Sequence, residues 1–387
     1  MSNWMIPYEK LDPAQKEFVK GYRSGNTWVL GYAGSGKSIL LVHLLKRLKD
    51  NDSSKTFGVV AFTRALGDLF RTGFQELGIK NVPIMTQFEL SRNPQHFDYL
   101  FCDEIQDMSK ETLAMIRSSA TCVIAAGDSN QSIYGDDLMT RTPTVTGDQP
   151  VTVLGASKKE LNIIYRLTES IISAVKKLMP HMSRNWAAKE DLTKVDVQIL
   201  VEKCLNREKE CKIVYEKAKG NCSEGERTVI LFPKHEHIVF FVQQVLRNAD
   251  KSPWSEETDR YGKPLYSDLN NYLRRQGIPM MYIGNNYGSL AEAQEKELII
   301  LMTYSSSKGL DFENVYMPFV NQDLFITQNA SLDRATFMVA MTRSSKRLNL
   351  YYTGEPSDYI KSFWDDEKHV IRIDGTITKQ DPNISLW

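Results

Sequence analysis

The chain has 387 residues, and its 48 Lys plus Arg equal its 48 Asp plus Glu, so the formal net charge is zero. This length suggests two or three domains. A composition of 42% hydrophobic and 25% charged residues is that of a folded globular protein and excludes a disordered one. Early prolines and charges in MSNWMIPYEKLDPAQ argue against a signal peptide, and no apolar run approaches the roughly 20 residues of a membrane span. We therefore expect a cytoplasmic protein without a membrane partner.

The cysteines indicate reduced thiols rather than a metal site. Their number is five, none forms a CxxC pair, and two lie in apolar runs where a thiol acts as a small hydrophobic group. An odd number of cysteines fits the reducing cytosol.

Between residue 27 and about residue 155, short apolar runs alternate with helical patterns. Strands that alternate with helices indicate a parallel sheet with crossover helices on both faces. The runs are TWVLGY, TFGVVAF, YLFCDE, TCVIAAGD and VTVL.

A second alternating set predicts a second α/β domain, with the runs RTVILFP, MMYIG, ELIILMTY, NVYMPFV and RLNLYYTG. The turn-forming segment TPTVTGDQP, around residues 142–150, is interpreted as the link between the halves. This places the domains at 1–155 and 156–387. Residues 186–226 are charged and weakly periodic, and we interpret them as a solvated helix pair or a surface insertion.

The segment GYAGSGKS at residues 31–38 matches GxxxxGK[ST] in full. It follows an apolar run and opens a helical pattern, which is the context of a phosphate-binding P-loop. Its glycines permit backbone angles that turn N–H groups toward phosphate oxygens, and the helix N-terminus adds partial positive charge. Lys37 would bridge the β- and γ-phosphates of ATP, and the Ser38 hydroxyl would bind Mg²⁺. The nucleotide-binding residues expected here are Gly34, Ser35, Gly36, Lys37 and Ser38.

An acidic pair completes the chemistry that a P-loop alone lacks. FDYLFCDEIQDM is an apolar strand that ends in Asp103 and Glu104. An acid at the carboxyl edge of a neighbouring strand reaches the Mg²⁺ shell, which assigns Asp103 to the metal. Glu104 is then placed to act as the general base on the attacking water.

With these two motifs in order, the chain resembles the superfamily 1 helicases of the UvrD/Rep kind from about residue 11 to residue 350. The segments that carry the resemblance are LDPAQKEFV, AAGDSNQSIYG, IIYRLTESI, TYSSSKGLDF and VAMTRSSKRL. The resemblance implies an α/β fold of two RecA-like P-loop NTPase domains with parallel sheets, with the ATP site in the cleft between them. It also implies roles at this site for Gln15 (adenine edge), Gln131 (γ-phosphate sensor), Tyr165 (base), Arg166 and Arg343 (γ-phosphate), and Asp311 (nucleotide, with the turn 306–309 linking it to the strand).

The same resemblance implies a nucleic-acid path. In AFTRALGDLF, Phe62 and Thr63 would face the nucleic acid, and in MTQFE Thr86 would touch backbone phosphate. Tyr134 would lie beside the strand. Ser305 is a further candidate position, where relatives often carry His, and the change to serine removes a contact to the nucleic-acid backbone.

Two departures from the family limit what it implies. Asp136 and Asp137 follow IYG where relatives carry a Trp-Arg pair, so a base-stacking platform is replaced by acids that would repel phosphate, unless the loop turns away and the acids face solvent. The large inserted subdomains are also missing, since only LSRNPQHF separates two of the motifs.

The resulting hypothesis is an ATP- and Mg²⁺-dependent translocase or helicase that acts on single-stranded DNA rather than RNA. The alternative is a nucleic-acid-stimulated ATPase subunit of a larger repair or defence complex, with a partner such as a nuclease and little unwinding of its own. A third possibility is a nucleotide-gated interaction module, against which the intact set of Glu104, Gln131, Arg166 and Arg343 argues.

Overall fold

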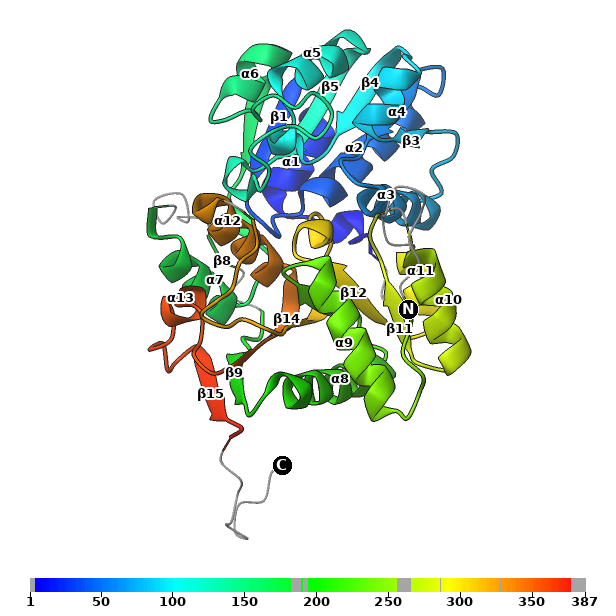
Figure 1. Ribbon diagram of the computed structural model, residues 1–387. Helices are drawn as coiled ribbons and strands as arrows, with labels where there is room; N and C mark the ends of the chain where they lie inside the picture. The colour runs from blue at the N-terminus through cyan, green and yellow to red at the C-terminus, as the bar shows by residue number, and fades with distance from the viewer. Residues whose placement is uncertain are drawn as a thin grey trace.

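The computed structural model describes residues 4–181, 189–190, 194–255, 266–285, 287–327 and 329–376. Two parallel sheets, each in its own domain, lie one above the other in Figure 1. Both are covered by helices on two faces, as in RecA-like domains. None of the helices in the described residues combines the length and apolar character that a membrane span requires.

The first sheet has the strand order β3-β2-β4-β5-β1-β6, and every neighbouring pair is parallel. Its strands are β1 (Thr27–Gly31), β2 (Phe57–Val60), β3 (Ile84–Met85), β4 (Phe97–Cys102), β5 (Ala120–Gly127) and β6 (Ser157–Leu161). Its helices are α1 (Pro13–Gly21), α2 (Lys37–Asn51), α3 (Arg64–Glu76), α4 (Gln87–Arg92), α5 (Lys110–Ser118) and α6 (Gln149–Leu154), with short 3₁₀ turns η1 (Tyr8–Lys10), η2 (Ile105–Asp107) and η3 (Ser129–Gln131).

Alternate residues of the strands enter separate hydrophobic clusters on the two faces of this sheet. In β4, Leu100 and Cys102 pack in the cluster that contains Leu113 of α5, whereas Phe101 packs in the cluster that contains Leu41 of α2. This follows from the two-residue period of a strand. Because both faces are buried, the strands read as continuous apolar runs.

The second sheet has the order β11-β12-β10-β13-β14-β9-β15 and is also parallel throughout. Its strands are β9 (Ile199–Cys204), β10 (Thr228–Phe232), β11 (Met280–Tyr282), β12 (Ile299–Thr303), β13 (Phe312–Met317), β14 (Ser344–Thr353) and β15 (Val370–Asp374). Its helices are α7 (Glu169–Leu178), α8 (Arg207–Ser223), α9 (His235–Asn248), α10 (Tyr266–Gln276), α11 (Leu290–Glu295), α12 (Ala330–Met341) and α13 (Asp358–Lys361), with the turn η5 (Ser305–Ser307) and a small ribbon of β7 (Ile163–Ile164) with β8 (Lys189–Glu190).

The expected link and domain boundary lie too early in the chain. VTVL, expected as a strand, belongs to helix α6, and residues 142–150 pack on the first domain through buried Val145. Strand β6 then pairs with β1, so the first sheet continues to Leu161 rather than ending at residue 155. The cause is that β6, SKKEL, is a polar edge strand that lacks an apolar signal.

The expected helix pair in residues 186–226 is also wrong where the structure describes it. Residues 199–204 form the buried strand β9, and α8 packs on the sheet through Cys211, Val214 and Ala218. Residues 186–188 and 191–193 lie outside the described residues. All five cysteines are free and buried. A role as small hydrophobic groups was expected only for the two in apolar runs, Cys102 and Cys122, and both lie in buried strands.

Candidate active site between the two domains

The P-loop connects the end of β1 to the start of α2. Gly34 and Gly36 have φ of +77° and +83°, in the left-handed region that a glycine adopts without strain. Lys37, the first residue of α2, folds back so that its ammonium donates to the carbonyls of Gly31 (2.6 Å) and Tyr32 (3.1 Å). Burial lowers the pKa of Lys37, although Asp128 and Glu104 oppose this effect. Its hydrogen bonds use neutral acceptors, so its charge is left for an anion in the loop.

Gln15 lies against this loop. The Asp12 side chain caps helix α1 in a capping box with Gln15, and the Gln15 amide donates to the Ser35 carbonyl at 3.1 Å. The Tyr165 hydroxyl donates to the same Asp12 carboxylate. The two residues expected to meet the base are therefore brought together from α1 and from the segment after β6.

Gly34 also contacts the segment that leads into the second domain. Its carbonyl accepts from the backbone N–H of Tyr165 (3.0 Å) and Arg166 (3.3 Å). A Cβ added at Gly34 would lie 2.6 Å from the Cβ of Arg166, so this position has both a backbone and a steric reason for glycine. Arg166 is flanked by Ile164 and Leu167, which pack in the main core of the second domain.

Asp103 and Ser38 form a pair that fits a divalent cation. The Ser38 hydroxyl donates to the Asp103 carboxylate. Burial and the neighbouring charge of Glu104 raise the pKa of Asp103, and a cation would favour its charged form. Serine and carboxylate oxygens are ligands that Mg²⁺ accepts. One detail of the expectation is corrected: β4 is not the neighbour of β1, since β5 lies between them.

Glu104 adopts an unusual backbone conformation. Its φ of +57° is left-handed for a non-glycine residue, and such strain persists only where the surroundings enforce it. The Gln106 amide donates to its carboxylate, which is buried. Burial alone would raise the pKa of Glu104, but the charges of Lys308 and Lys37 outweigh it and lower that pKa. The side chain is therefore held as a carboxylate, the form that a general base requires.

Gln131 and Arg343 join the two domains. The Gln131 amide donates to Asp128 (2.7 Å), and its oxygen accepts from the Arg343 guanidinium (3.1 Å). Arg343 also donates to the carbonyls of Val339 (2.8 Å) and Leu310 (3.0 Å). Burial and the charge of Arg166 lower the pKa of Arg343 to about 9. These acceptors are neutral, so a second buried cation faces the cleft without a neutralising partner among them.

Most of these residues, although not Asp103, line one cavity of about 460 Å³. On the side of the first domain the cavity is lined by the P-loop, Gln15, Glu104 and Gln131. On the side of the second it is lined by Arg166, Asp311 and Arg343. Apolar side chains also line it: Trp4, Ile6, Leu11, Ile39 and Leu69. A cavity lined by both apolar and cationic side chains suits a nucleotide, whose base is apolar on its faces and whose phosphates are anionic.

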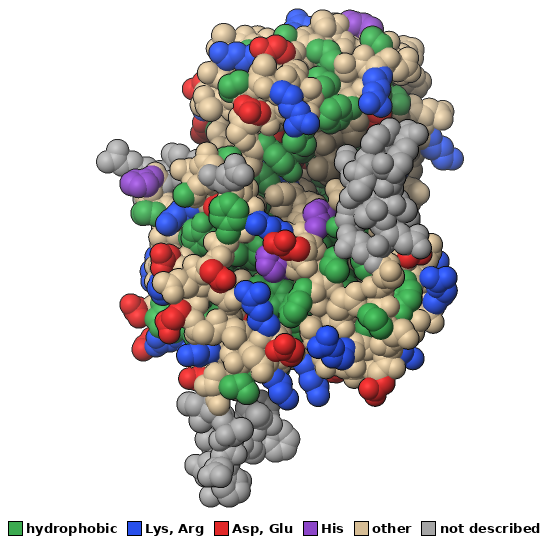
Figure 2. Space-filling view, in the orientation of Figure 1, with side chains coloured by type: hydrophobic (Ala, Val, Ile, Leu, Met, Phe, Trp, Pro, Cys, Tyr) green, Lys and Arg blue, Asp and Glu red, His purple; other side chains and the backbone are tan. Residues whose placement is uncertain are grey.

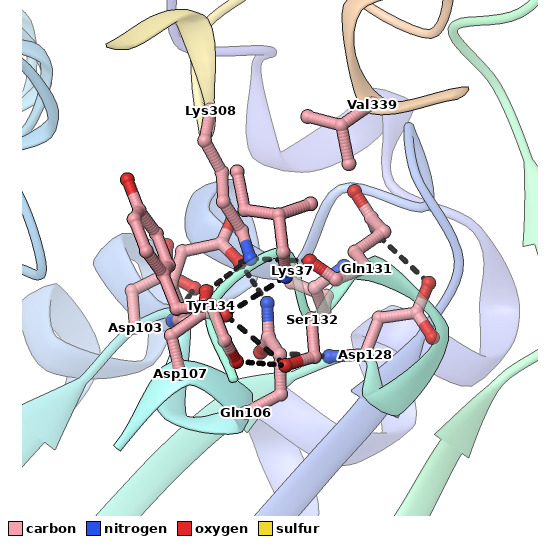
Figure 3. A network of polar contacts seen from close by, with 12 residues as sticks. Lys37, Asp103, Gln106, Asp107, Asp128, Gln131, Ser132, Tyr134, Lys308 and Val339 are labelled. Atoms are coloured by element: carbon pink, nitrogen blue, oxygen red, sulfur yellow. Dashed lines mark hydrogen bonds and ion pairs between the residues drawn. The ribbon is translucent and has the colours of Figure 1, made fainter. Parts of the chain in front are cut away.

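Two residues of this site were missed at the level of sequence. Arg227 lines the cavity and donates to Asp311 at 3.3 Å. Lys308 extends from the second domain into a buried network with Asp107 and Gln131 of the first (Figure 3). Lys308 lies within the turn 306–309, which the resemblance implied to link nucleotide and strand, but no contact was assigned to the Lys308 side chain itself. Arg227 carries no motif signal, and only the fold reveals it.

The candidate nucleic-acid residues are found at helix starts and in a turn. Thr63 caps α3 by accepting from Leu66 (3.1 Å), and Thr86 caps α4 in a capping box with Glu89. The Phe62 and Tyr134 rings pack with centroids 5.4 Å apart, and Phe62 is buried. Ser305 is partly exposed. On the face shown in Figure 2, the surface is hollowed between the two domains.

The acidic pair does not act as expected. Asp136 is exposed, but Asp137 is buried and accepts hydrogen bonds from Ser109 (2.7 Å), Thr112 (2.6 Å) and Met139 (2.7 Å). The expectation that both acids repel phosphate is therefore wrong for Asp137, which organises the loop instead. Burial alone would raise the pKa of Asp137, but the hydrogen bonds from Thr112 and Ser109 outweigh it and lower that pKa.

Two RecA-like domains that line one cavity together are the arrangement of helicase-type motors. Comparison with known proteins bears this out: residues 27–146 match the model of the viral superfamily 1 RNA helicase core domain. This match covers a minority of the chain and supports a superfamily 1-type helicase core. A search of curated proteins gave no match.

Solved structures are similar in fold. The DUF1998 helicase MrfA bound to DNA aligns over 95% of this chain and 54% of its own, with 9% identity and a TM-score of 0.52. Arterivirus nonstructural protein 10, a helicase in complex with DNA, aligns over 87% of this chain and 62% of its own, at 16% identity and a TM-score of 0.41. The C-terminal domain of a possible DNA helicase from Lactobacillus plantarum WCFS1 aligns over 54% and 98%, at 17% identity and a TM-score of 0.35. This chain thus spans little more than half the length of the first two.

Proposed function

We propose that this protein is an ATP-dependent translocase or helicase of the UvrD/Rep kind that acts on single-stranded nucleic acid, DNA in preference to RNA. One observation carries the proposal: Lys37, Glu104 and Gln131 of the first domain and Arg166 and Arg343 of the second line one cavity. Such a site is complete only when the two domains are together, so nucleotide turnover and domain movement depend on each other.

The residues divide the chemistry of phosphate hydrolysis among themselves. Ser38 and Asp103 would hold Mg²⁺, which neutralises phosphate charge when bound. Glu104 takes a proton from the water that attacks the γ-phosphate. Lys37, Arg166 and Arg343 stabilise the negative charge that develops on the transferred group. The hydrogen bonds that Lys37 and Arg343 donate to carbonyl and amide oxygens leave their charges to act on that group.

Gln15, Tyr165 and Asp311 would hold the nucleoside end. Tyr165 and Asp311 come from the segments that follow β6 and β12, so nucleotide binding would involve both domains. The nucleic-acid strand would contact five other residues: Phe62, Thr63, Thr86, Tyr134 and Ser305.

The preference for DNA rests on the resemblance to UvrD/Rep and on matched structures that contain DNA. The matched family model is named for RNA helicases, and both nucleic acids therefore belong in the test. A cytoplasmic location remains part of the proposal.

A second candidate function is an ATPase subunit that relies on a partner protein, such as a nuclease, for strand separation. The loop after Gly135 favours this second candidate. Its Asp137 carboxylate accepts hydrogen bonds from Ser109 and Met139 and so holds the loop folded. Residues 136–137 also carry no side chain that could stack on a base. The short connections between motifs agree with this reading, since only residues 93–96 separate α4 from β4.

Rates of ATP hydrolysis without nucleic acid, with single-stranded DNA and with single-stranded RNA test the proposal. We expect hydrolysis that DNA stimulates more than RNA. Hydrolysis that neither polymer stimulates would refute a nucleic-acid motor. If a polymer does stimulate hydrolysis, a strand-displacement assay separates the helicase from the partner-dependent ATPase.

A further inference from the structure

The segment that precedes helix α1 forms part of the nucleotide cavity. We call residues 4–11 the N-terminal segment. Four of its residues line the cavity: Trp4, Ile6, Lys10 and Leu11. Among the motifs identified in the sequence, only LDPAQKEFV reaches this segment, and that motif begins at Leu11. Residues 4–10 therefore contribute to the site without a motif that indicates it.

Hydrogen bonds to two helices hold the N-terminal segment in place. The Glu76 carboxylate, at the end of α3, accepts from the backbone N–H groups of Trp4 (2.9 Å) and Met5 (2.7 Å). The His43 ring of α2 donates to the Ile6 carbonyl (2.8 Å). Hydrogen bonds to the backbone fix the path of the chain and not only the position of one side chain. The segment is therefore part of the fold of the first domain.

The indole of Trp4 packs on α3 at a position that only a glycine leaves open. A Cβ added at Gly73 would lie 2.3 Å and 2.7 Å from two carbon atoms of the Trp4 ring, which is closer than non-bonded carbon atoms approach. Phe70, one turn earlier in α3, meets the indole at an edge, with ring centroids 6.2 Å apart. A glycine inside a helix is destabilising relative to alanine, so room for the indole accounts for Gly73. The contacts with α3 therefore hold the Trp4 ring at the cavity.

The cavity lining around Trp4 is apolar and partly aromatic. Four residues line the cavity and also belong to one hydrophobic cluster of the first domain: Trp4, Leu11, Ile39 and Leu69. Tyr165 adds a second aromatic ring to the lining. Such a surface offers nothing to a phosphate group, which binds to N–H donors and cations. It suits the face of a base, because every base can stack on an aromatic ring through its own π-system.

We propose that Trp4 is a base-stacking residue of the nucleotide cavity, and that the N-terminal segment thereby favours a purine nucleotide over a pyrimidine one. This proposal rests on the proposed function and leaves its hydrolytic chemistry unchanged. The two fused rings of a purine present more area to an indole than the single ring of a pyrimidine does, so a purine gains more from the contact. Trp4 takes no part in hydrolysis and acts on the nucleoside end alone.

The binding of compounds that the protein does not hydrolyse separates the base from the phosphates. Isothermal titration calorimetry measures the affinities for Mg²⁺-ADP, Mg²⁺-CDP and Mg²⁺-pyrophosphate, the last of which has no base. The variants are Trp4→Ala, Trp4→Leu, which keeps an apolar side chain against α3, and Trp4→Phe, which keeps an aromatic ring. Trp364→Ala is the matched control, because Trp364 is also a partly buried tryptophan but lines a different pocket, beside Tyr352.

We expect Trp4→Ala to lower the affinity for ADP by roughly 5- to 150-fold, which corresponds to the loss of one base–aromatic stack. The loss should be smaller for CDP, and the affinity for pyrophosphate should stay that of the wild type. Trp4→Leu should behave as Trp4→Ala does, and it supplies the result if Trp4→Ala does not fold. Trp4→Phe should retain most of the affinity for ADP, and Trp364→Ala should retain all of it.

An affinity for ADP that is unchanged in Trp4→Ala or Trp4→Leu would show that the indole does not touch the base, and it overturns the proposal. An equal loss for ADP and pyrophosphate also overturns it, since the N-terminal segment would then only support the P-loop. Equal affinities of the wild type for ADP and CDP would refute the preference for purines. A wild type that binds none of the three compounds would instead refute the nucleotide site, and the proposed function with it.

Discussion

At the scale of single residues, Glu104 combines a buried side chain with a negative charge. Its left-handed backbone directs a buried carboxylate into the cavity, where Lys37 and Lys308 keep its pKa low against the effect of burial. A carboxylate with these neighbours can accept a proton from water, whereas an amide in its place cannot.

Glu104→Gln should therefore leave ATP binding nearly intact and lower turnover by roughly 10²-fold or more, since a general base contributes 10²- to 10⁴-fold. Lys37→Ala should also weaken binding, because it removes a charge from the phosphates. Nucleotide binding by fluorescence and hydrolysis by phosphate release measure the two effects. Wild-type turnover in Glu104→Gln would show that this residue is not the base.

The sequence was most informative for residues whose spacing is dictated by the ligand. The P-loop could be predicted from its glycines and lysine, because phosphate imposes that pattern on any chain. Lys308 and Arg227 could not be assigned in the same way, since their roles follow from partners 201 and 84 residues away in the chain.

At the scale of elements, the loop between η3 and α6 forms a folded turn at the position where the helicase relatives carry a base-stacking Trp-Arg pair. Asp137 accepts from the backbone of Ser109, Met139 and Thr140 and from the Thr112 hydroxyl. The adjacent Asp136 is exposed. The sequence alone could not separate these two acids, because burial of one of them depends on α5 of the same domain.

We expect Asp137→Ala to lower the stability of the first domain by about 2–4 kcal/mol, since it leaves several buried donors unpaired. Asp136→Ala is the matched control and should change stability by less than about 0.5 kcal/mol. Denaturant unfolding measures both. Equal stability of the two variants would mean that the Asp137 hydrogen bonds are not formed in solution.

Strand prediction succeeded for most strands whose two faces are both apolar, but it missed the polar edge strand β6 and also the buried internal strand β9. β1, β2, β4 and β5 were identified from their runs, whereas β6 was missed and VTVL was assigned to a strand although it lies in α6. The hydrophobicity of a segment indicates whether it is buried, so it does not reveal a polar edge strand. β6 is identified as a strand only by its pairing with β1.

At the scale of the whole molecule, the candidate active site is one that neither domain forms alone. Arg343 and Gln131 meet across the cleft, and the segment of Arg166 is held against the P-loop by Gly34. Closure would bring both arginines to one phosphoryl group. Their effects should then be non-additive, so the variant with both replaced by Ala should lose less activity than the sum of the single losses.

The most direct measurement of this claim is the steady-state hydrolysis of ATP by Arg343→Ala in the presence of single-stranded DNA. Arg274→Ala is the control, because Arg274 is an exposed arginine of the same domain that pairs with Glu292 at 2.9 Å. We predict that kcat falls by about 10³-fold or more in Arg343→Ala, as for other arginines that act on the transferred phosphate, with a much smaller rise in KM. The control should retain wild-type kcat. An unchanged kcat with a raised KM in Arg343→Ala would place this arginine outside the catalytic cleft and contradict a site completed by the second domain.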